Sequence, residues 1–185
     1  DPVMGDGGKL YQTYTKEMAD GMGRLCRKAD IVVPNMTEAC HLLGRDYDPG
    51  PYTREQVEEI LRGLCELGPK MAVLTGVWLK AGSLGTACFD SQTGRTELFL
   101  TDRIEGFYHG TGDLFASALL GGLLNGMTLE ASCKIATEFT WRTIETTFEK
   151  SADHRFGPKF EAHLPWLAEK MEACRKSVAN LGNLR

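Results

Sequence analysis

The chain has 185 residues, of which 42% are hydrophobic and 25% are charged. This length and composition are typical of one folded domain and exclude a disordered, collagen-like or disulfide-scaffold protein. The 21 basic and 25 acidic residues give a formal net charge of −4, so we expect neither nucleic acid nor a membrane surface as a partner.

Three further features of the sequence narrow its class. The most apolar stretch, residues 114–127, is broken by glycine and polar residues and is shorter than the ~20 apolar residues of a membrane-spanning helix. The start at Asp1 lacks the basic and apolar regions of a signal peptide, and we expect a fragment or a processed chain. The six cysteines show no C-x-x-C spacing, which favours reduced thiols in the cytoplasm over a zinc site or disulfides.

The first part of the chain alternates predicted strands and helices. Asp1 to Met4 resembles the end of a strand, and a glycine-rich loop follows at residues 5–8. A helix is expected at residues 15–29, with an apolar face made of Met18, Met22, Leu25 and Cys26. Apolar spacing and end signals then predict a strand at 31–33, a helix at 37–43, a helix at 53–67 that opens on a Thr53/Gln56 capping box, and a strand at 71–75.

The second part begins with a predicted hairpin and ends in helices. Residues 83–89 and 95–101 flank a turn-rich segment, which predicts an antiparallel pair. Helices are predicted at residues 111–124, 128–148 and 164–178. The alternation of strands and helices predicts an α/β fold with a mostly parallel sheet, helices on both of its faces and one antiparallel hairpin. No linker divides the chain, so we expect a single domain over residues 1–185.

The sequence Gly110-Thr111-Gly112-Asp113 opens a helix that is apolar on nearly every side and is therefore expected to be deeply buried. The first N–H groups of a helix lack internal partners and carry partial positive charge, so two glycines that allow close approach favour an anion such as phosphate. Asp113 could accept the proton of a hydroxyl group that receives a phosphoryl group. The structural alternative is that Thr111 or Asp113 only caps the helix.

Two further clusters follow predicted strand ends, where ligands of α/β folds bind. Asn35 and Glu38 form an N-x-x-E motif directly after the strand at 31–33, and the alternative there is a capping box. Asp1 and Asp6 stand at the first strand end. Oxygen ligands from separate loops are what a Mg²⁺ ion that bridges phosphates requires. The three clusters together favour a small-molecule kinase.

Four segments, in this order and spacing, resemble the pyridoxal kinase branch of the ribokinase-like superfamily over nearly the whole chain. They are Asp1-Pro-Val-Met-Gly-Asp6 with Gly-Lys-Leu-Tyr11, Ala29-Asp-Ile-Val-Val-Pro-Asn-Met-Thr-Glu38, Gly110-Thr-Gly-Asp-Leu-Phe115, and the tail Arg155-Phe-Gly-Pro-Lys-Phe-Glu161, which is similar to bacterial members.

The resemblance implies a three-layer ribokinase-like fold of which this chain is the C-terminal, nucleotide-binding portion, with the N-terminal part missing. The implied reaction is ATP-dependent phosphorylation of the 5′-hydroxymethyl group of pyridoxal, pyridoxine or pyridoxamine in a cytoplasmic homodimer. The implied cofactor is Mg²⁺, with a monovalent cation left open.

The resemblance also implies roles for individual residues. Asp113 matches the catalytic base, and Gly110, Thr111 and Gly112 match the anion hole. The positions that hold Mg²⁺ and the triphosphate are matched by Asp1, Asp6 and Glu38, the N-x-x-E motif is completed by Asn35, and a nucleotide contact is matched by Thr75. The chain departs from some relatives at Val33, which offers only a backbone carbonyl, and none of its residues matches the pocket for the pyridine ring.

Three alternatives remain open at the level of the sequence. A hydroxymethylpyrimidine kinase of thiamine biosynthesis would share the fold and the Gly110–Asp113 loop. A non-catalytic nucleotide-binding fragment would bind ATP without transferring phosphate, and a structural domain would bind no nucleotide. The continuation Gly5-Asp6-Gly-Gly-Lys-Leu-Tyr11 and the aspartate at 113 favour the vitamin B6 kinase.

Overall fold

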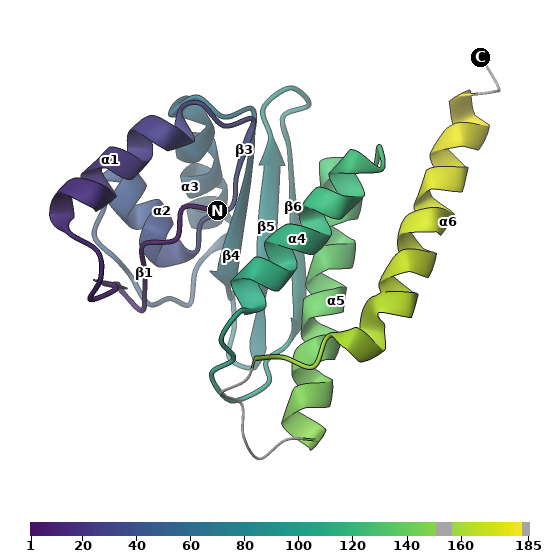
Figure 1. The fold of residues 1–185 in the computed structure, drawn as a ribbon. Helices are drawn as coiled ribbons and strands as arrows, with labels where there is room; N and C mark the ends of the chain where they lie inside the picture. Colours follow the sequence, from purple (N-terminus) through teal and green to yellow (C-terminus); the bar gives the residue numbers. More distant parts are fainter. Residues whose placement is uncertain (151–156, 183–185) are drawn as a thin grey trace. The chain divides into compact units, whose positions relative to one another are not determined.

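The computed structural model describes residues 1–150 and 157–182. The chain divides into two compact units, which we call unit 1 (Asp1–Asp102) and unit 2 (Arg103–Arg185) and describe separately. Unit 1 combines strands and helices, and the described part of unit 2 is helical (Figure 1). The expectation of a single domain over residues 1–185 stays a prediction.

The main sheet of unit 1 has the strand order β3-β4-β5-β6. Strand β3 (Ile31–Val32) is parallel to β4 (Met71–Val77), whereas β5 (Ser83–Asp90) is antiparallel both to β4 and to β6 (Arg95–Asp102). The predicted hairpin is thus confirmed. The sheet is mixed rather than mostly parallel, which corrects that expectation: a short loop joins β4 to β5, and a parallel pair would need a long crossover.

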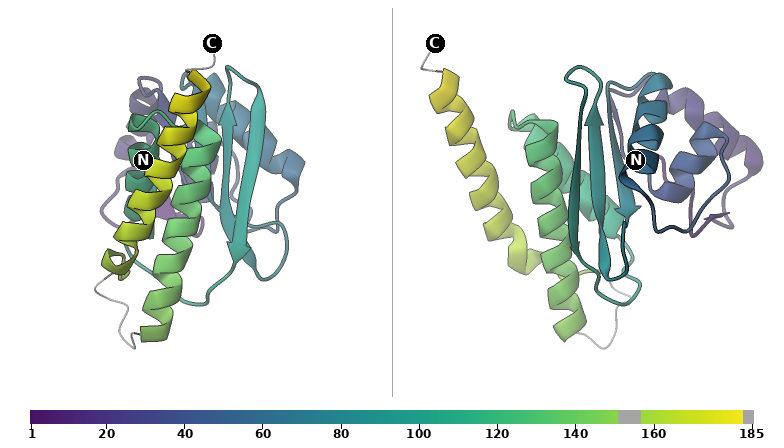
Figure 2. Two further views of the ribbon diagram at one scale, coloured as in Figure 1. Left: turned by 90° about the vertical axis from the view of Figure 1, so that its right-hand side faces the viewer. Right: turned by 180° about the vertical axis from the view of Figure 1, so that it is seen from behind.

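Three helices lie together on one side of this sheet: α1 (Lys16–Cys26), α2 (Met36–Leu43) and α3 (Arg54–Glu66) (Figures 1 and 2). The apolar side chains of α3 recur at three-four spacing, so they lie on one face of the helix, which packs against the sheet. These side chains belong to the core of unit 1 and are Val57, Ile60, Leu61 and Leu64.

The apolar face predicted for α1 is buried only in part. Ala19 and Cys26 are buried, and Met22 packs against the core. In contrast, the side chains of Met18 and Leu25 are 51% and 67% exposed. Helical spacing identified the apolar face of α1 correctly. This face is wider than the part of it that packs against α2.

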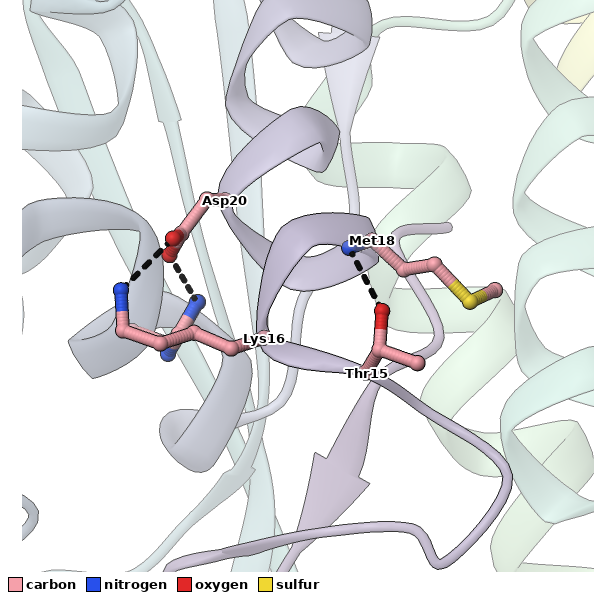
Figure 3. Close-up of polar contacts among 5 residues, drawn as sticks. Thr15, Lys16, Met18 and Asp20 are labelled. Atoms are coloured by element: carbon pink, nitrogen blue, oxygen red, sulfur yellow. Dashed lines mark hydrogen bonds and ion pairs between the residues drawn. The ribbon is translucent and has the colours of Figure 1, made fainter.

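The N-terminus of α1 is stabilised by its own side chains (Figure 3). The Thr15 hydroxyl accepts a hydrogen bond from the backbone N–H of Met18 at 3.2 Å, and Lys16 forms an ion pair with Asp20 at 2.7 Å. The second carboxylate oxygen of Asp20 lies 3.7 Å from Nε2 of His41 in α2. This last contact connects two neighbouring helices of unit 1.

A small hairpin replaces the strand end and loop that the sequence predicted at the start of the chain. Strands β1 (Gly5–Asp6) and β2 (Lys9–Leu10) pair antiparallel, while residues 1–4 are in no strand. Gly7 and Gly8 form the turn with φ of 57° and 78°, the conformation that a two-residue hairpin turn requires. The run Asp-Gly-Gly was therefore a hairpin signal.

Unit 2 contains α4 (Thr111–Leu124), α5 (Leu129–Lys150), a short 3₁₀ turn (Glu161–His163) and α6 (Leu164–Gly182). Helices α4 and α5 approach closely at Gly122, where an added Cβ atom would lie 2.6 Å from Oγ of Ser132. The guanidinium of Arg142 on α5 lies 4.7 Å from the ring centroid of Trp166 on α6, which holds these two helices together.

Two expectations from the sequence concern the burial of α4 and the state of the cysteines. Helix α4 is not buried on every side, because Leu120 and Leu124 are 52% and 78% exposed. The six cysteines all lie in the described segments, and none of them is in a disulfide there. Among the helices of residues 1–150 and 157–182, none combines the length and the apolar character that crossing a membrane requires.

Candidate functional site

The Asn35–Glu38 motif forms the N-terminus of α2. The side chain of Asn35 accepts a hydrogen bond from the backbone N–H of Glu38 at 3.0 Å, and Oε2 of Glu38 accepts one from the backbone N–H of Asn35 at 2.8 Å. This is a complete capping box. The capping-box alternative for this motif is therefore confirmed. Both side chains also form further hydrogen bonds.

The same two side chains also hold the start of the chain. The backbone N–H of Met4 donates to Oε1 of Glu38 at 2.9 Å, and Nδ2 of Asn35 donates to the carbonyl of Gly5 at 2.8 Å. The side chain of Glu38 has backbone partners on both of its oxygens, and the residue is 3% exposed. The motif thus ties the segment that carries Asp6 to the N-terminus of α2.

Burial dominates the electrostatics of Glu38. Desolvation raises the pKa of this carboxyl group above its ordinary value, and the negative charge of Asp6 adds to the rise. Hydrogen bonds from the backbone N–H groups of Asn35, Met4 and Gly5 act in the opposite direction and favour the charged form. A direct metal bond at Glu38 would compete with these N–H groups, so its metal role stays a prediction.

Thr75 lies beside this motif at the carboxyl ends of the parallel pair β3 and β4. Its backbone N–H donates to the carbonyl of Pro34 at 3.0 Å, and Thr75 forms a parallel bridge with Asn35. The strand register shifts between Thr75 and Val77, and Gly76 has a φ of 72° in this bulge. The structure therefore brings Asn35, Glu38 and Thr75 together at the edge where ligands of α/β folds bind.

The carboxylates of Asp1 and Asp6 are exposed at the start of unit 1. Oδ1 of Asp6 accepts a hydrogen bond from the N–H of Gly7 at 2.7 Å. The charges of Asp6 and Glu38, together with burial as the largest cause, raise the pKa of the Tyr11 hydroxyl. In the described part of the chain, no three His, Cys, Asp or Glu side chains are placed to hold a metal ion. This donor set fits Mg²⁺ that arrives with phosphate, since such an ion needs one or two carboxylates.

Helix α4 begins without a side-chain cap. Gly110 is its N-cap residue, with φ and ψ of 85° and 3°, and no side chain in residues 1–150 or 157–182 caps the helix there. The Thr111 hydroxyl instead donates to the carbonyl of Tyr108 at 3.1 Å. The capping alternative for Thr111 and Asp113 is therefore wrong. Among the described residues no side chain caps these first N–H groups, and the dipole favours an anion.

Space around this helix start fits the same interpretation. A Cβ atom added to Gly112 would meet no atom within 4 Å. A Cβ atom added to Gly110 would lie 4.0 Å from Cδ of Pro158. Pro158 belongs to the C-terminal segment, residues 155–161, that carries the family resemblance, so this segment lies beside the loop. The first two residues of that segment, Arg155 and Phe156, lie outside the described residues. Asp113 is exposed in the first turn of α4, where its carboxylate can meet a ligand.

The predicted site residues thus form two groups. Asp1, Asp6, Asn35, Glu38 and Thr75 belong to unit 1, and Gly110, Thr111, Gly112 and Asp113 belong to unit 2. Sequence reasoning missed two contacts of the β1–β2 turn, which involve Thr37 and Tyr47. The threonine in the run Asn-Met-Thr-Glu was a signal for the first, and no local pattern points to the second.

Comparison with known proteins assigns the chain to a family. The sequence profile of the phosphomethylpyrimidine kinase family matches residues 1–158. A Caenorhabditis elegans protein assigned as a pyridoxal kinase is 35% identical over 138 residues, which are 71% of this chain and 40% of that protein. The chain belongs to the phosphomethylpyrimidine kinase family, and its expected resemblance to pyridoxal kinases is confirmed.

Solved structures agree with this assignment. A Bacteroides thetaiotaomicron structure assigned as a phosphomethylpyrimidine kinase and solved with pyridoxal is 34% identical, has a TM-score of 0.85, and is matched over 91% of this chain and 59% of that one. For an ADP complex of Bacillus subtilis pyridoxal kinase the identity is 26%, the TM-score is 0.64, and the coverages are 78% and 53%. The α/β, ribokinase-like fold is thereby confirmed. The chain spans roughly half the length of these relatives.

Proposed function

We propose that this protein transfers the γ-phosphoryl group of ATP to the 5′-hydroxymethyl group of a vitamin B6 compound. The observation that carries the proposal is the start of α4. There an uncapped helix N-terminus, an open approach at Gly112 and the exposed carboxylate of Asp113 occur within four residues. These are the parts that phosphoryl transfer needs, because its catalysis consists mainly of positioning and of stabilising negative charge.

Each residue of this loop has a role in the proposed reaction. The N–H groups of Thr111 and Gly112 bind the phosphoryl oxygens as negative charge develops on them. The carboxylate of Asp113 accepts the proton of the attacking hydroxyl group, which makes its oxygen a better nucleophile. Gly110 supports both, because its left-handed conformation directs the chain into the helix without a side chain at the entrance.

The nucleotide side of the proposal involves unit 1. Thr75 and Asn35, adjacent at the ends of β4 and β3, contact the nucleotide, and the carboxylates of Asp1 and Asp6 hold Mg²⁺. When bound, the ion neutralises charge on the phosphates. The ADP complex of the related B. subtilis kinase supports ATP as the phosphoryl donor.

A hydroxymethylpyrimidine is the second candidate acceptor, because the family profile is that of the phosphomethylpyrimidine kinases. The vitamin B6 assignment is supported by the names of the C. elegans and B. subtilis relatives and by the pyridoxal in the Bacteroides structure. Turnover of pyridoxal and of hydroxymethylpyrimidine by the complete protein, measured in parallel, tests the choice. A higher kcat/KM for the pyrimidine would replace the first proposal with the second.

The role of Asp113 is tested with Asp113→Asn. The amide keeps the shape of the side chain but cannot accept the proton, so kcat with pyridoxal should fall by roughly 10²- to 10⁴-fold. Nucleotide affinity should stay within about tenfold, and the melting temperature should not change, because Asp113 caps nothing in the structure. A folded variant that retains more than about a third of the wild-type kcat would contradict the general-base role.

A further inference from the structure

The β1–β2 hairpin cannot be held in place by its own strands. Each strand has two residues, and isolated hairpins are at best marginally stable in water. Its turn residues, Gly7 and Gly8, have no side chains with which to pack. The position of Asp6, which ends β1, must therefore be set by contacts with the rest of unit 1.

Three side chains in the first turn of α2 supply hydrogen bonds to this segment. Two are those of Asn35 and Glu38 with Gly5 and Met4, described above. The third is formed by Thr37, whose Oγ1 accepts from the N–H of Gly8 at 2.9 Å. In a two-residue turn the closing bond uses the N–H of the following residue, so the N–H of Gly8 needs an acceptor outside the hairpin.

An aromatic ring also lies close to Gly8. A Cβ atom added to Gly8 would lie 2.6 Å from Cδ1 of Tyr47 and 3.1 Å from its Cγ. The turn thus contacts both the hydroxyl of Thr37 and the ring of Tyr47. The charge of Asp6 also raises the pKa of the Tyr47 hydroxyl, after burial as the larger cause, which agrees with this proximity.

The hydroxyl of Thr37 takes no part in the capping box of α2. Asn35 and Glu38 complete the capping box of α2 without it. Thr37 is 7% exposed, so its hydroxyl lies in the interface between α2 and the turn. We propose that Thr37 is a positioning residue that fixes the Gly7–Gly8 turn and thereby holds the carboxylate of Asp6 for Mg·ATP. This inference rests on the proposed kinase function.

Two substitutions at this position separate the hydroxyl from the shape of the side chain. Thr37→Val keeps the branched shape and removes the acceptor, whereas Thr37→Ser keeps the acceptor. In the complete protein, Thr37→Val should raise the KM for Mg·ATP by about three- to tenfold, the effect of one lost hydrogen bond, with little change in kcat. Hydrogen exchange of the peptide that contains Gly8 should accelerate, and Thr37→Ser should restore both values.

Thr93→Val is the matched control. Oγ1 of Thr93 accepts a hydrogen bond from the N–H of Arg95 at 3.4 Å in the turn between β5 and β6. Because Met71 at the start of β4 pairs with Asp90 at the end of β5, this turn lies at the opposite end of β4 from Thr75. This variant loses the same kind of contact and should leave the KM for Mg·ATP unchanged.

The outcomes distinguish this inference from the proposed function. If Thr37→Val leaves the KM for Mg·ATP unchanged, the positioning role is overturned, whether or not the turn exchanges faster. If the wild type phosphorylates neither pyridoxal nor hydroxymethylpyrimidine, the proposed function fails, and the Kd for Mg·ADP from calorimetry then replaces KM. A weaker Kd in Thr37→Val, restored in Thr37→Ser, supports the inference. An unchanged Kd, or a wild type that binds no Mg·ADP, overturns it.

Discussion

Two glycines at the start of α4 serve different purposes. Gly110 has a φ of 85°, a conformation that L side chains rarely adopt, so the backbone itself requires glycine there. Gly112 has no such requirement, and the space around it is open. If Gly112 is needed, the reason must be a ligand that approaches its backbone.

Substitution of Gly112 therefore separates binding from folding. Gly112→Val should leave the protein folded, with a free energy of unfolding within about 1 kcal/mol of the wild type, because glycine is itself a poor helix former. Kinase activity should nevertheless be lost, since the side chain fills the space that a phosphate would occupy. Gly21→Val in α1 is the control, with a similarly uncrowded position and unchanged activity expected. Wild-type turnover in Gly112→Val would refute the anion hole.

Cys65 on α3 allows the electrostatics of unit 1 to be checked. Burial, followed by the charge of Asp90, raises the pKa of this thiol from 9.0 to about 11. Because the thiolate is the reactive form, its alkylation by iodoacetamide should be slow at neutral pH and should still accelerate as the pH passes 9.0 toward about 11. The rate is measured by mass spectrometry of the Cys65 peptide, with Cys65→Ser as control. A rate that reaches half of its maximum near pH 9.0 would show an unshifted pKa.

At the scale of elements, the two capping boxes of unit 1 look alike in sequence and differ in structure. In α3, Oε1 of Gln56 accepts one hydrogen bond, from the N–H of Thr53. In α2, the two oxygens of Glu38 accept from Asn35 and from Met4. Local sequence predicts the first bond of each box, but the bond to Met4 joins residues 34 positions apart and is set by the tertiary fold.

This difference predicts unequal effects of exchanging the two residue types. Glu38→Gln leaves one acceptor oxygen for the N–H groups of Asn35, Met4 and Gly5 in a buried place and should destabilise the protein by about 1–3 kcal/mol. Gln56→Glu keeps the one acceptor that α3 uses and should change stability by less than about 0.5 kcal/mol. Urea unfolding of both variants measures the difference. Equal effects would mean that the bond from Met4 contributes nothing to stability.

The sequence predicted elements better than it predicted their surroundings. A capping box placed the start of α3, and apolar spacing placed α3 and α4 to within a residue or two, because both signals act locally. Sheet topology was less accessible, since the antiparallel pairing of β4 with β5 depends on the loop between them rather than on either strand. Exposure of Met18 and Leu124 was also missed, because periodicity identifies an apolar face without showing what covers it.

At the scale of the whole molecule, a family resemblance and the ends of the predicted strands identified the candidate site residues. The structure shows how the side chains in unit 1 are held. The proximity of Asn35 and Thr75 follows from the parallel pairing of β3 with β4, which an α/β pattern predicts. The bonds of Glu38 to Met4 and of Thr37 to Gly8 do not follow from any local pattern. They depend on how the hairpin folds back onto α2, which is a property of unit 1 as a whole.

The last prediction concerns residues 1–185 expressed as they stand. In the proposed function the two groups of candidate residues contact nucleotide, phosphate and Mg²⁺, and none of them resembles the pocket for a pyridine ring. We therefore expect calorimetry to detect binding of Mg·ATP, and a phosphate-transfer assay with pyridoxal to detect no turnover.

Gly112→Val should weaken binding by at least about tenfold, and Asp113→Asn by less than that, because only the first blocks the approach of a phosphate. A folded chain that binds no Mg·ATP would contradict the assignment of both groups, and turnover of pyridoxal would show that residues recognising the ring lie within this chain.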